Sequence, residues 1–149
     1  IRMTDVWQLH YRSLENMYHK NAKINEFFHP RLTIARMEAE VKIPVVPDFF
    51  HAGGSVHGSV YFKALDDAAF FAANSIVRDV FVLTLTFQIQ LTRAVRDGIM
   101  TAKGRVLQNL GNQIMAESIL YDERGRETAR GNGVFVKSKL PLSPEIGYA

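Results

Sequence analysis

One segment of this 149-residue chain, residues 51–74, most restricts the folds that it can adopt. It begins with a glycine-containing loop, His51 to Gly58, and continues to Asn74 through residues that are apolar on almost every side. The second part predicts a helix of about five turns. A helix without a polar face is normally buried on most of its surface, so the rest of the chain must supply elements that cover it.

Two elements are predicted ahead of this helix. Residues 4–20 begin with a capping Thr4 and place aromatic and leucine side chains at spacings of three and four, which predicts an amphipathic helix. Residues 32–43 alternate between small or apolar and charged side chains, which predicts one half-buried strand that ends at Pro44.

Four strands are predicted after the helix. In residues 81–91 one face of the strand is expected to be buried and the other exposed to solvent. The expected buried face comprises Phe81, Leu83, Leu85, Phe87, Ile89 and Leu91, and the exposed face comprises Thr84, Thr86, Gln88 and Gln90. Segments 99–107, 113–121 and 127–137 are the other strands, with turn signals at 109–112 and 122–126.

This order predicts an α+β fold, in which an antiparallel sheet of five to six strands wraps around one long central helix. The length suits a single domain spanning 1–149. Its parts are the N-terminal helix 4–20, a core over 32–138 and a tail over 141–149, which holds two prolines and is expected to be loose.

Composition narrows the possible functions. The chain has no cysteine, which excludes disulfides, a thiol nucleophile and cysteine-based metal sites. His10, His19 and His29 lack metal-ligand spacing, so we expect surface or packing roles for them and no metal site. The basic residues are scattered and no apolar run approaches the length of a membrane span. We therefore expect a cytoplasmic protein that binds neither nucleic acid nor membrane.

Two features of the central segment could carry chemistry. The N–H of Gly58 lies at the start of a helix, where backbone donors are free and the peptide dipoles are positive, so it could polarise a carbonyl group. The alternative is that the glycines of the loop only permit a tight turn. Asp66 and Asp67 lie in the middle of an apolar helix, pointing about 100° apart, so at least one is expected to face solvent.

The pattern His57-Gly58, followed by Asp66 on a long helix and then by four antiparallel strands, resembles the hot-dog-fold acyl-CoA thioesterases. The likeness is to the phenylacetyl-CoA and hydroxybenzoyl-CoA thioesterase branch and covers about residues 32 to 138. It implies a sheet wrapped around a central helix, no cofactor apart from the coenzyme A of the substrate, and a homodimer or a dimer of dimers. It also implies sites between subunits, with Asp66 of one chain facing the loop of another.

The resemblance also implies roles for individual residues. Asp66 is the nucleophile or general base, and the Gly58 N–H holds the thioester carbonyl. His51 stands where the family usually has asparagine or glutamine, and Ser59 replaces a second glycine. His51 is expected to help position the attacking water or the carbonyl group. The expected substrate contacts are His57, Ser59, Phe70, one turn beyond Asp66, and Thr84, which could hydrogen-bond near the site.

Two other functions stay open at this point. His51 and Asp66 could move protons in a hot-dog hydratase or dehydratase, because histidine titrates near neutral pH. A protein that binds acyl-CoA without turning it over is the second. The thioesterase interpretation is preferred, because the spacing from His57-Gly58 to Asp66 matches that family better. The substrate could be carried by coenzyme A or by an acyl carrier protein.

Overall fold

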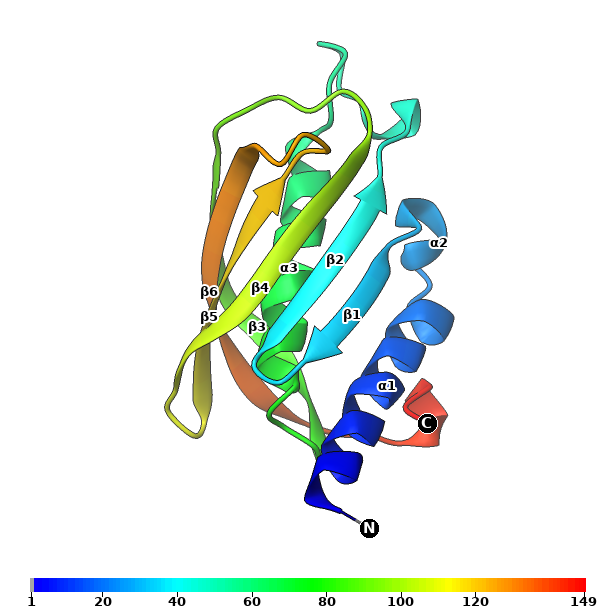
Figure 1. The fold of residues 1–149 in the computed structure, drawn as a ribbon, viewed down its shortest axis with the longest axis vertical. Helices are drawn as coiled ribbons and strands as arrows, with labels where there is room; N and C mark the ends of the chain where they lie inside the picture. Colours follow the sequence, from blue (N-terminus) through cyan, green and yellow to red (C-terminus); the bar gives the residue numbers. More distant parts are fainter. Residues whose placement is uncertain (1) are drawn as a thin grey trace.

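Helix α3 (Gly58–Asn74) is the centre of the computed structural model, which describes residues 2–149. A six-stranded antiparallel sheet curls around it in the order β1-β2-β4-β5-β6-β3 (Figure 1). The small side chains Ala64, Ala68, Ala69 and Ala72 are fully buried and let the sheet approach the helix closely. The structure therefore confirms the predicted α+β fold with one long helix inside an antiparallel sheet.

The strands are β1 (Arg31–Ala35), β2 (Glu38–Pro44), β3 (Val80–Leu91), β4 (Ile99–Asn109), β5 (Gln113–Tyr121) and β6 (Glu127–Pro141). Short turns join β4 to β5 and β5 to β6. Both turns lie where the sequence signals put them.

Residues 31–44 form a hairpin, so the prediction of a single strand over 32–43 is wrong. β1 and β2 pair through Ala35 and Glu38, with only two residues between them. One of these, Met37, has a positive φ of 63° without being glycine. Its N–H donates to Ser75 Oγ at 2.9 Å, and its carbonyl accepts from the Val106 N–H at 2.9 Å. Tertiary contacts thus hold a turn for which the local sequence carries no signal.

The predicted faces of β3 are wrong around Leu83 to Leu85, because the pairing of β3 with β6 shifts register between Thr84 and Thr86. Beyond the shift, Phe87 and Ile89 pack against the core as predicted. Val82 is fully buried, and Thr84 turns toward α3, whereas Leu83 and Leu85 are 49% and 57% exposed. Such an irregularity reverses which residues face inward. It places a hydroxyl group, and not a leucine, beside the central helix.

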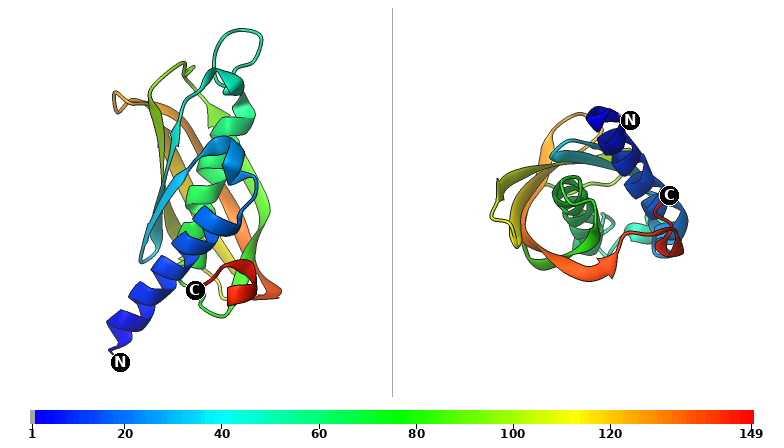
Figure 2. Two further views of the ribbon diagram at one scale, coloured as in Figure 1. Left: turned by 90° about the vertical axis from the view of Figure 1, so that its right-hand side faces the viewer. Right: turned by 90° about the horizontal axis from the view of Figure 1, so that it is seen from below.

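Part of the side of α3 that the sheet leaves open is covered by helix α1 (Met3–Asn21) and the C-terminal segment (Figure 2). α1 is one residue longer at each end than the sequence analysis expects, and a short helix α2 (Asn25–Phe28) follows it. Short 3-10 helices lie at Pro47–Phe49 and Pro144–Ile146.

The tail beyond Pro141 is packed and not loose. The Tyr148 hydroxyl contacts His10 Nδ1 at 2.7 Å, and the Leu142 N–H donates to the Asp79 carbonyl at 3.0 Å. Leu142, Ile146 and Tyr148 pack against the core. The segment is therefore held against α1 and the core.

Gly104 on β4 offers a test of the close contact between sheet and helix. A Cβ atom there would collide with the carbonyl oxygen of Ala68 on α3. We expect Gly104→Ala to lower the free energy of unfolding by about 1–3 kcal/mol, because the strand and helix must separate. Urea denaturation measures this, with Arg105→Ala as the control on the same strand. The Arg105 side chain is exposed, so a loss as large as that of Gly104→Ala would contradict the account.

Candidate active site

The N-terminus of α3 is capped by its own neighbours. His57 is the N-cap residue, and its Nδ1 accepts a hydrogen bond from the Ser59 N–H at 3.0 Å and lies 2.9 Å from Ser59 Oγ. Both side chains are exposed. The pair fixes the first turn of the helix, and the Gly58 N–H between them has no acceptor among residues 2–149. Gly58 therefore presents a free donor at the positive end of the helix.

His51 is held by its own loop. Its Nδ1 accepts from the Gly53 N–H at 2.9 Å, and its Nε2 lies 3.0 Å from Oγ of the buried Ser55. Because Nδ1 is an acceptor, neutral His51 carries its proton on Nε2 and donates it to Ser55. The ring thus stabilises the glycine turn that precedes α3.

Asp66 lies in the middle of α3 and turns toward β3. The Thr84 hydroxyl donates to Asp66 Oδ1 at 2.9 Å, so the register shift of β3 brings a partner to this carboxyl group. Burial raises the pKa of Asp66 to about 6, opposed by the Thr84 hydrogen bond, while the charge of Asp67 raises it and that of Lys63 lowers it. Asp66 is therefore a carboxyl group whose ionisation falls just below neutral pH.

Asp67 turns toward α1, where it is paired, so the expectation that one aspartate faces solvent is wrong. Its Oδ2 accepts from Lys63 Nζ at 2.7 Å and from the Tyr18 hydroxyl at 2.6 Å. The Lys63 and Asp67 side chains are only 12% and 15% exposed. Burial raises the pKa of Asp67, and the charge and hydrogen bond of Lys63 and the hydrogen bond of Tyr18 oppose this. The two aspartates do point apart, but α1 covers the second.

A pocket of about 320 Å³ opens between α1, α3 and the beginning of β3. Asp66 lies on its wall together with Phe70, one turn further along the same face of α3. Phe70 packs against Phe81 of β3 with ring centroids 5.2 Å apart. The rest of the wall is mainly apolar and includes Met17 of α1. The site is thus a carboxyl group at the side of an aromatic pocket.

The structure brings some of the predicted site residues together and separates others. Asp66, Thr84 and Phe70 are joined by the contacts above. Gly58 lies eight residues before Asp66 on the same helix, a rise of about 12 Å. Residues 51–59 do not line the pocket. One chain therefore cannot place its Gly58 N–H and its Asp66 on the same small group.

Sequence reasoning assigned no role at the site to Tyr18 or Lys63. The spacing of four between Lys63 and Asp67 is a helical ion-pair signal that could have found the first contact. Tyr18 had no such signal, because its place in an aromatic stripe on α1 indicated only packing.

Comparison with known proteins identifies the family. The sequence profile of the thioesterase superfamily matches residues 53–129, more than half of the chain. This chain belongs to the thioesterase superfamily. A Saccharolobus solfataricus protein named "Putative esterase" is 24% identical over 123 residues, covering 82% of this chain and 88% of that protein.

Solved structures agree with the fold of this superfamily member. The PaaI protein of E. coli, from the phenylacetic acid degradation operon, superposes with a TM-score of 0.80 at 16% identity. The match covers 91% of this chain and 99% of that one. Conserved protein PA5202 of Pseudomonas aeruginosa gives a TM-score of 0.74 at 24% identity, over 78% and 94% of the two chains. The predicted resemblance to hot-dog thioesterases is thereby confirmed.

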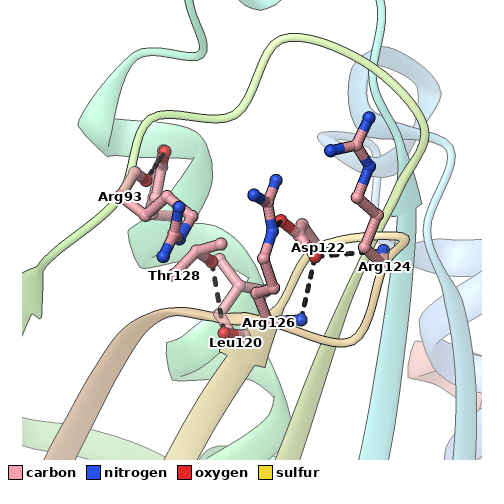
Figure 3. Close-up of polar contacts among 7 residues, drawn as sticks. Arg93, Leu120, Asp122, Arg124, Arg126 and Thr128 are labelled. Atoms are coloured by element: carbon pink, nitrogen blue, oxygen red, sulfur yellow. Dashed lines mark hydrogen bonds and ion pairs between the residues drawn. The ribbon is translucent and has the colours of Figure 1, made fainter.

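Arginines gather on the loops near the N-terminal end of α3 (Figure 3). The Tyr61 hydroxyl on the first turn of α3 donates to the Arg93 carbonyl at 2.7 Å, and the Arg93 N–H donates to the Thr128 carbonyl. In the β5–β6 turn, Asp122 accepts from Arg126 Nε at 2.8 Å. No carboxylate of residues 2–149 pairs with the guanidinium groups of Arg93 or Arg124, so these two positive charges are uncompensated by an ion pair.

None of the helices in residues 2–149 combines the length and apolar character needed to cross a membrane.

The raised pKa of Asp66 predicts a gain in stability when its charge is removed. Folded Asp66 binds its proton more tightly than unfolded aspartate, so stability falls as pH rises from 3.8 to about 6, and the loss is complete above that. An asparagine side chain at this position needs no ionisation and could still accept from Thr84. We expect Asp66→Asn to raise the free energy of unfolding by about 1–2 kcal/mol at about pH 8, and the gain to vanish below about pH 4.

Urea denaturation across this pH range measures the effect. The control is Asp122→Asn, which removes a carboxylate that accepts hydrogen bonds from Arg124 and Arg126 and should bring no gain at about pH 8. A gain for Asp66→Asn that is the same at every pH would contradict the raised pKa.

Proposed function

We propose that this protein is an acyl-CoA thioesterase, which hydrolyses a thioester to a free acid and coenzyme A. The observation that carries the proposal is Asp66, a carboxyl group held by Thr84 beside an apolar aromatic pocket. The membership of the thioesterase superfamily and the free N–H of Gly58 support it. Thioester hydrolysis needs a base or nucleophile, an oxyanion donor and a dry place for the acyl group.

In the proposed reaction the Gly58 N–H donates to the thioester carbonyl oxygen. Ionised Asp66 removes a proton from water, the resulting hydroxide attacks the carbonyl carbon, the C–S bond breaks, and the proton held by Asp66 passes to the departing thiolate. Alternatively, the carboxylate attacks the carbonyl itself and expels the thiolate as the C–S bond breaks, and water then hydrolyses the resulting anhydride to the free acid and the aspartate. The pKa of about 6 supports either role, since Asp66 is ionised at neutral pH and is more basic than an exposed aspartate.

We propose further that the site is completed by a second copy of the chain. The separation of Gly58 and Asp66 along α3 supports this, because a second α3 could bring its own Gly58 to the first Asp66. β3 is an edge strand of twelve residues, and its exposed leucines make it a poor strand to leave in water. Pairing along β3 would extend the sheet and bury Leu83 and Leu85.

Coenzyme A is the proposed carrier of the acyl group. Arg93 lies beside the N-terminal end of α3, where the Gly58 N–H would hold the carbonyl, and Arg124 lies on the β5–β6 turn at the same end of the molecule (Figure 3). Unpaired guanidinium groups bind phosphates well. This arrangement favours coenzyme A, which carries several phosphate groups. An acyl carrier protein would offer the arginines an acidic surface instead.

The rival function is a hydratase or dehydratase in which His51 works with Asp66. Both ring nitrogens of His51 are engaged within its loop, so neither is free to move a proton on a substrate. Non-catalytic binding of acyl-CoA would not require a carboxyl group in an apolar pocket. Both points favour hydrolysis.

Asp66→Asn tests the proposal, with Asp67→Asn as the matched control on the neighbouring residue. We expect Asp66→Asn to lower kcat by about 100-fold or more, because it removes the base or nucleophile. Asp67→Asn should retain turnover within about tenfold, because Asp67 lines the same pocket but its carboxylate is already engaged by Lys63 and Tyr18. Thiol release from short, long and aromatic acyl-CoAs measures this.

The remaining outcomes of this assay decide against the proposal. Absence of thiol release together with hydration of crotonyl-CoA would support the His51 and Asp66 pair. Equal loss in the two aspartate variants would mean that Asp66 has no special role.

The oligomer is tested by Leu85→Glu on β3. Two negative charges brought together along a shared edge strand should convert the dimer to monomer and abolish turnover. Analytical ultracentrifugation measures the mass. The control is Leu107→Glu on β4, where the leucine is similarly exposed, at 46%. A dimer that survives Leu85→Glu but not Leu107→Glu would place the interface elsewhere.

A further inference from the structure

The C-terminal segment, residues 140–148, forms one wall of the pocket that contains Asp66. Leu140 and Ile146 contribute this wall, whereas Leu142 between them does not line the pocket. Phe70 and Phe81 line the same pocket. We propose that this segment is the size filter for the acyl group, with Leu140 and Ile146 as the residues that set the length admitted. The proposal rests on the proposed thioesterase function and goes beyond it to substrate choice.

The first argument is that the segment is fixed in place along its length. Pro141 pairs with Val80, and the Leu142 N–H donates to the Asp79 carbonyl, so the start of the segment is tied to the start of β3. Gly147 then turns with a φ of 90°. A Cβ atom at Gly147 would lie 2.8 Å from Asn21 Cβ, so the turn is pressed against α1.

The second argument is a pair of hydrogen bonds through the buried His10, called the latch below, at the far end of the segment. His10 is 2% exposed, and its Nε2 lies 2.9 Å from the Asn74 carbonyl at the end of α3. A carbonyl can only accept, so Nε2 carries the proton and Nδ1 accepts from the Tyr148 hydroxyl at 2.7 Å. This chain of two hydrogen bonds connects the segment to α1 and α3 together. A wall held in this way can exclude a longer ligand, whereas a mobile one would move aside.

The third argument is the chemistry of the enclosed space. The pocket measures about 320 Å³, and aromatic and aliphatic side chains line most of it. Besides Asp66, the charged side chains of the lining are Lys63 and Asp67, which pair with each other, and Asp67 also accepts from the Tyr18 hydroxyl. These groups are already engaged, so they offer little to a polar acyl group. The fitting substrates are therefore thioesters of uncharged, apolar acids of limited length. Once the acyl chain fills the pocket, each further methylene group should lower kcat/KM by about tenfold or more.

The experiment compares kcat/KM for straight-chain acyl-CoAs from butanoyl to palmitoyl. Ile146→Ala and Leu140→Ala should raise the ratio of long-chain to short-chain kcat/KM by about tenfold or more, because each opens the wall. Ile146→Phe should change the ratio in the opposite direction. Leu142→Ala is the matched control in the same segment and should leave the ratio unchanged, even if its melting temperature falls.

Tyr148→Phe tests the latch without changing the shape of the pocket. It keeps the ring and removes the hydroxyl that contacts His10. The length profile, meaning the dependence of kcat/KM on acyl chain length, should therefore broaden toward longer acyl groups. An unchanged profile in this variant would remove the latch from the proposal.

Equilibrium binding of non-hydrolysable thioether analogues of the same acyl-CoAs separates the two proposals. If wild type releases no thiol but Ile146→Ala shifts the preferred length of the bound analogue, the size filter stands and the hydrolase proposal fails. If thiol release depends on Asp66 but the three Leu140 and Ile146 variants keep the wild-type profile in turnover and binding, the size filter is wrong and the hydrolase stands.

Discussion

A central helix that is apolar on almost every side must be covered on every side, and the rest of the structure depends on this requirement. The sheet curls around one side of α3, and α1 with the C-terminal segment covers another (Figure 2). What is left open is the stripe that includes Phe62, which is 40% exposed and packs against Phe87 of β3. The uncovered stripe and the free edge of β3 lie side by side, which is the reason to expect a second copy there.

The same requirement gives each aspartate of α3 its character. A carboxyl group on a buried helix is unfavourable unless it is paired or protonated. Asp67 is paired with Lys63 and Tyr18 and so contributes to the attachment of α1. Asp66 receives only a neutral hydroxyl from Thr84, which opposes burial too weakly to prevent a rise of its pKa to about 6. Burial raises the pKa of both carboxyl groups, but only Asp67 is paired with a cation, so Asp66 is the one that we propose for chemistry.

The sequence predicted those parts of the fold whose signals are local. The apolar helix and the turns between β4, β5 and β6 follow from periodicity and from glycine and asparagine in the turns. The β1–β2 turn could not be found, because contacts from Ser75 and Val106 hold Met37 in a left-handed conformation. The inward position of Thr84 depends on the register between β3 and β6, which no single strand reveals. Spacing and resemblance pointed to Asp66 as the candidate carboxyl group, but its burial and its contact with Thr84 could be seen only in the packed structure.

The most direct test of the account is complementation between two inactive chains. Gly58→Pro removes the proposed donor N–H at the first helical position, where proline is tolerated, and Asp66→Asn removes the proposed base. If each site takes Gly58 from one chain and Asp66 from the other, mixed dimers hold one intact site. Unfolding and refolding the two variants together should then restore thiol release to about one quarter of wild type. Mixtures as inactive as the separate variants, despite proven mixed dimers, would contradict a site shared between two chains.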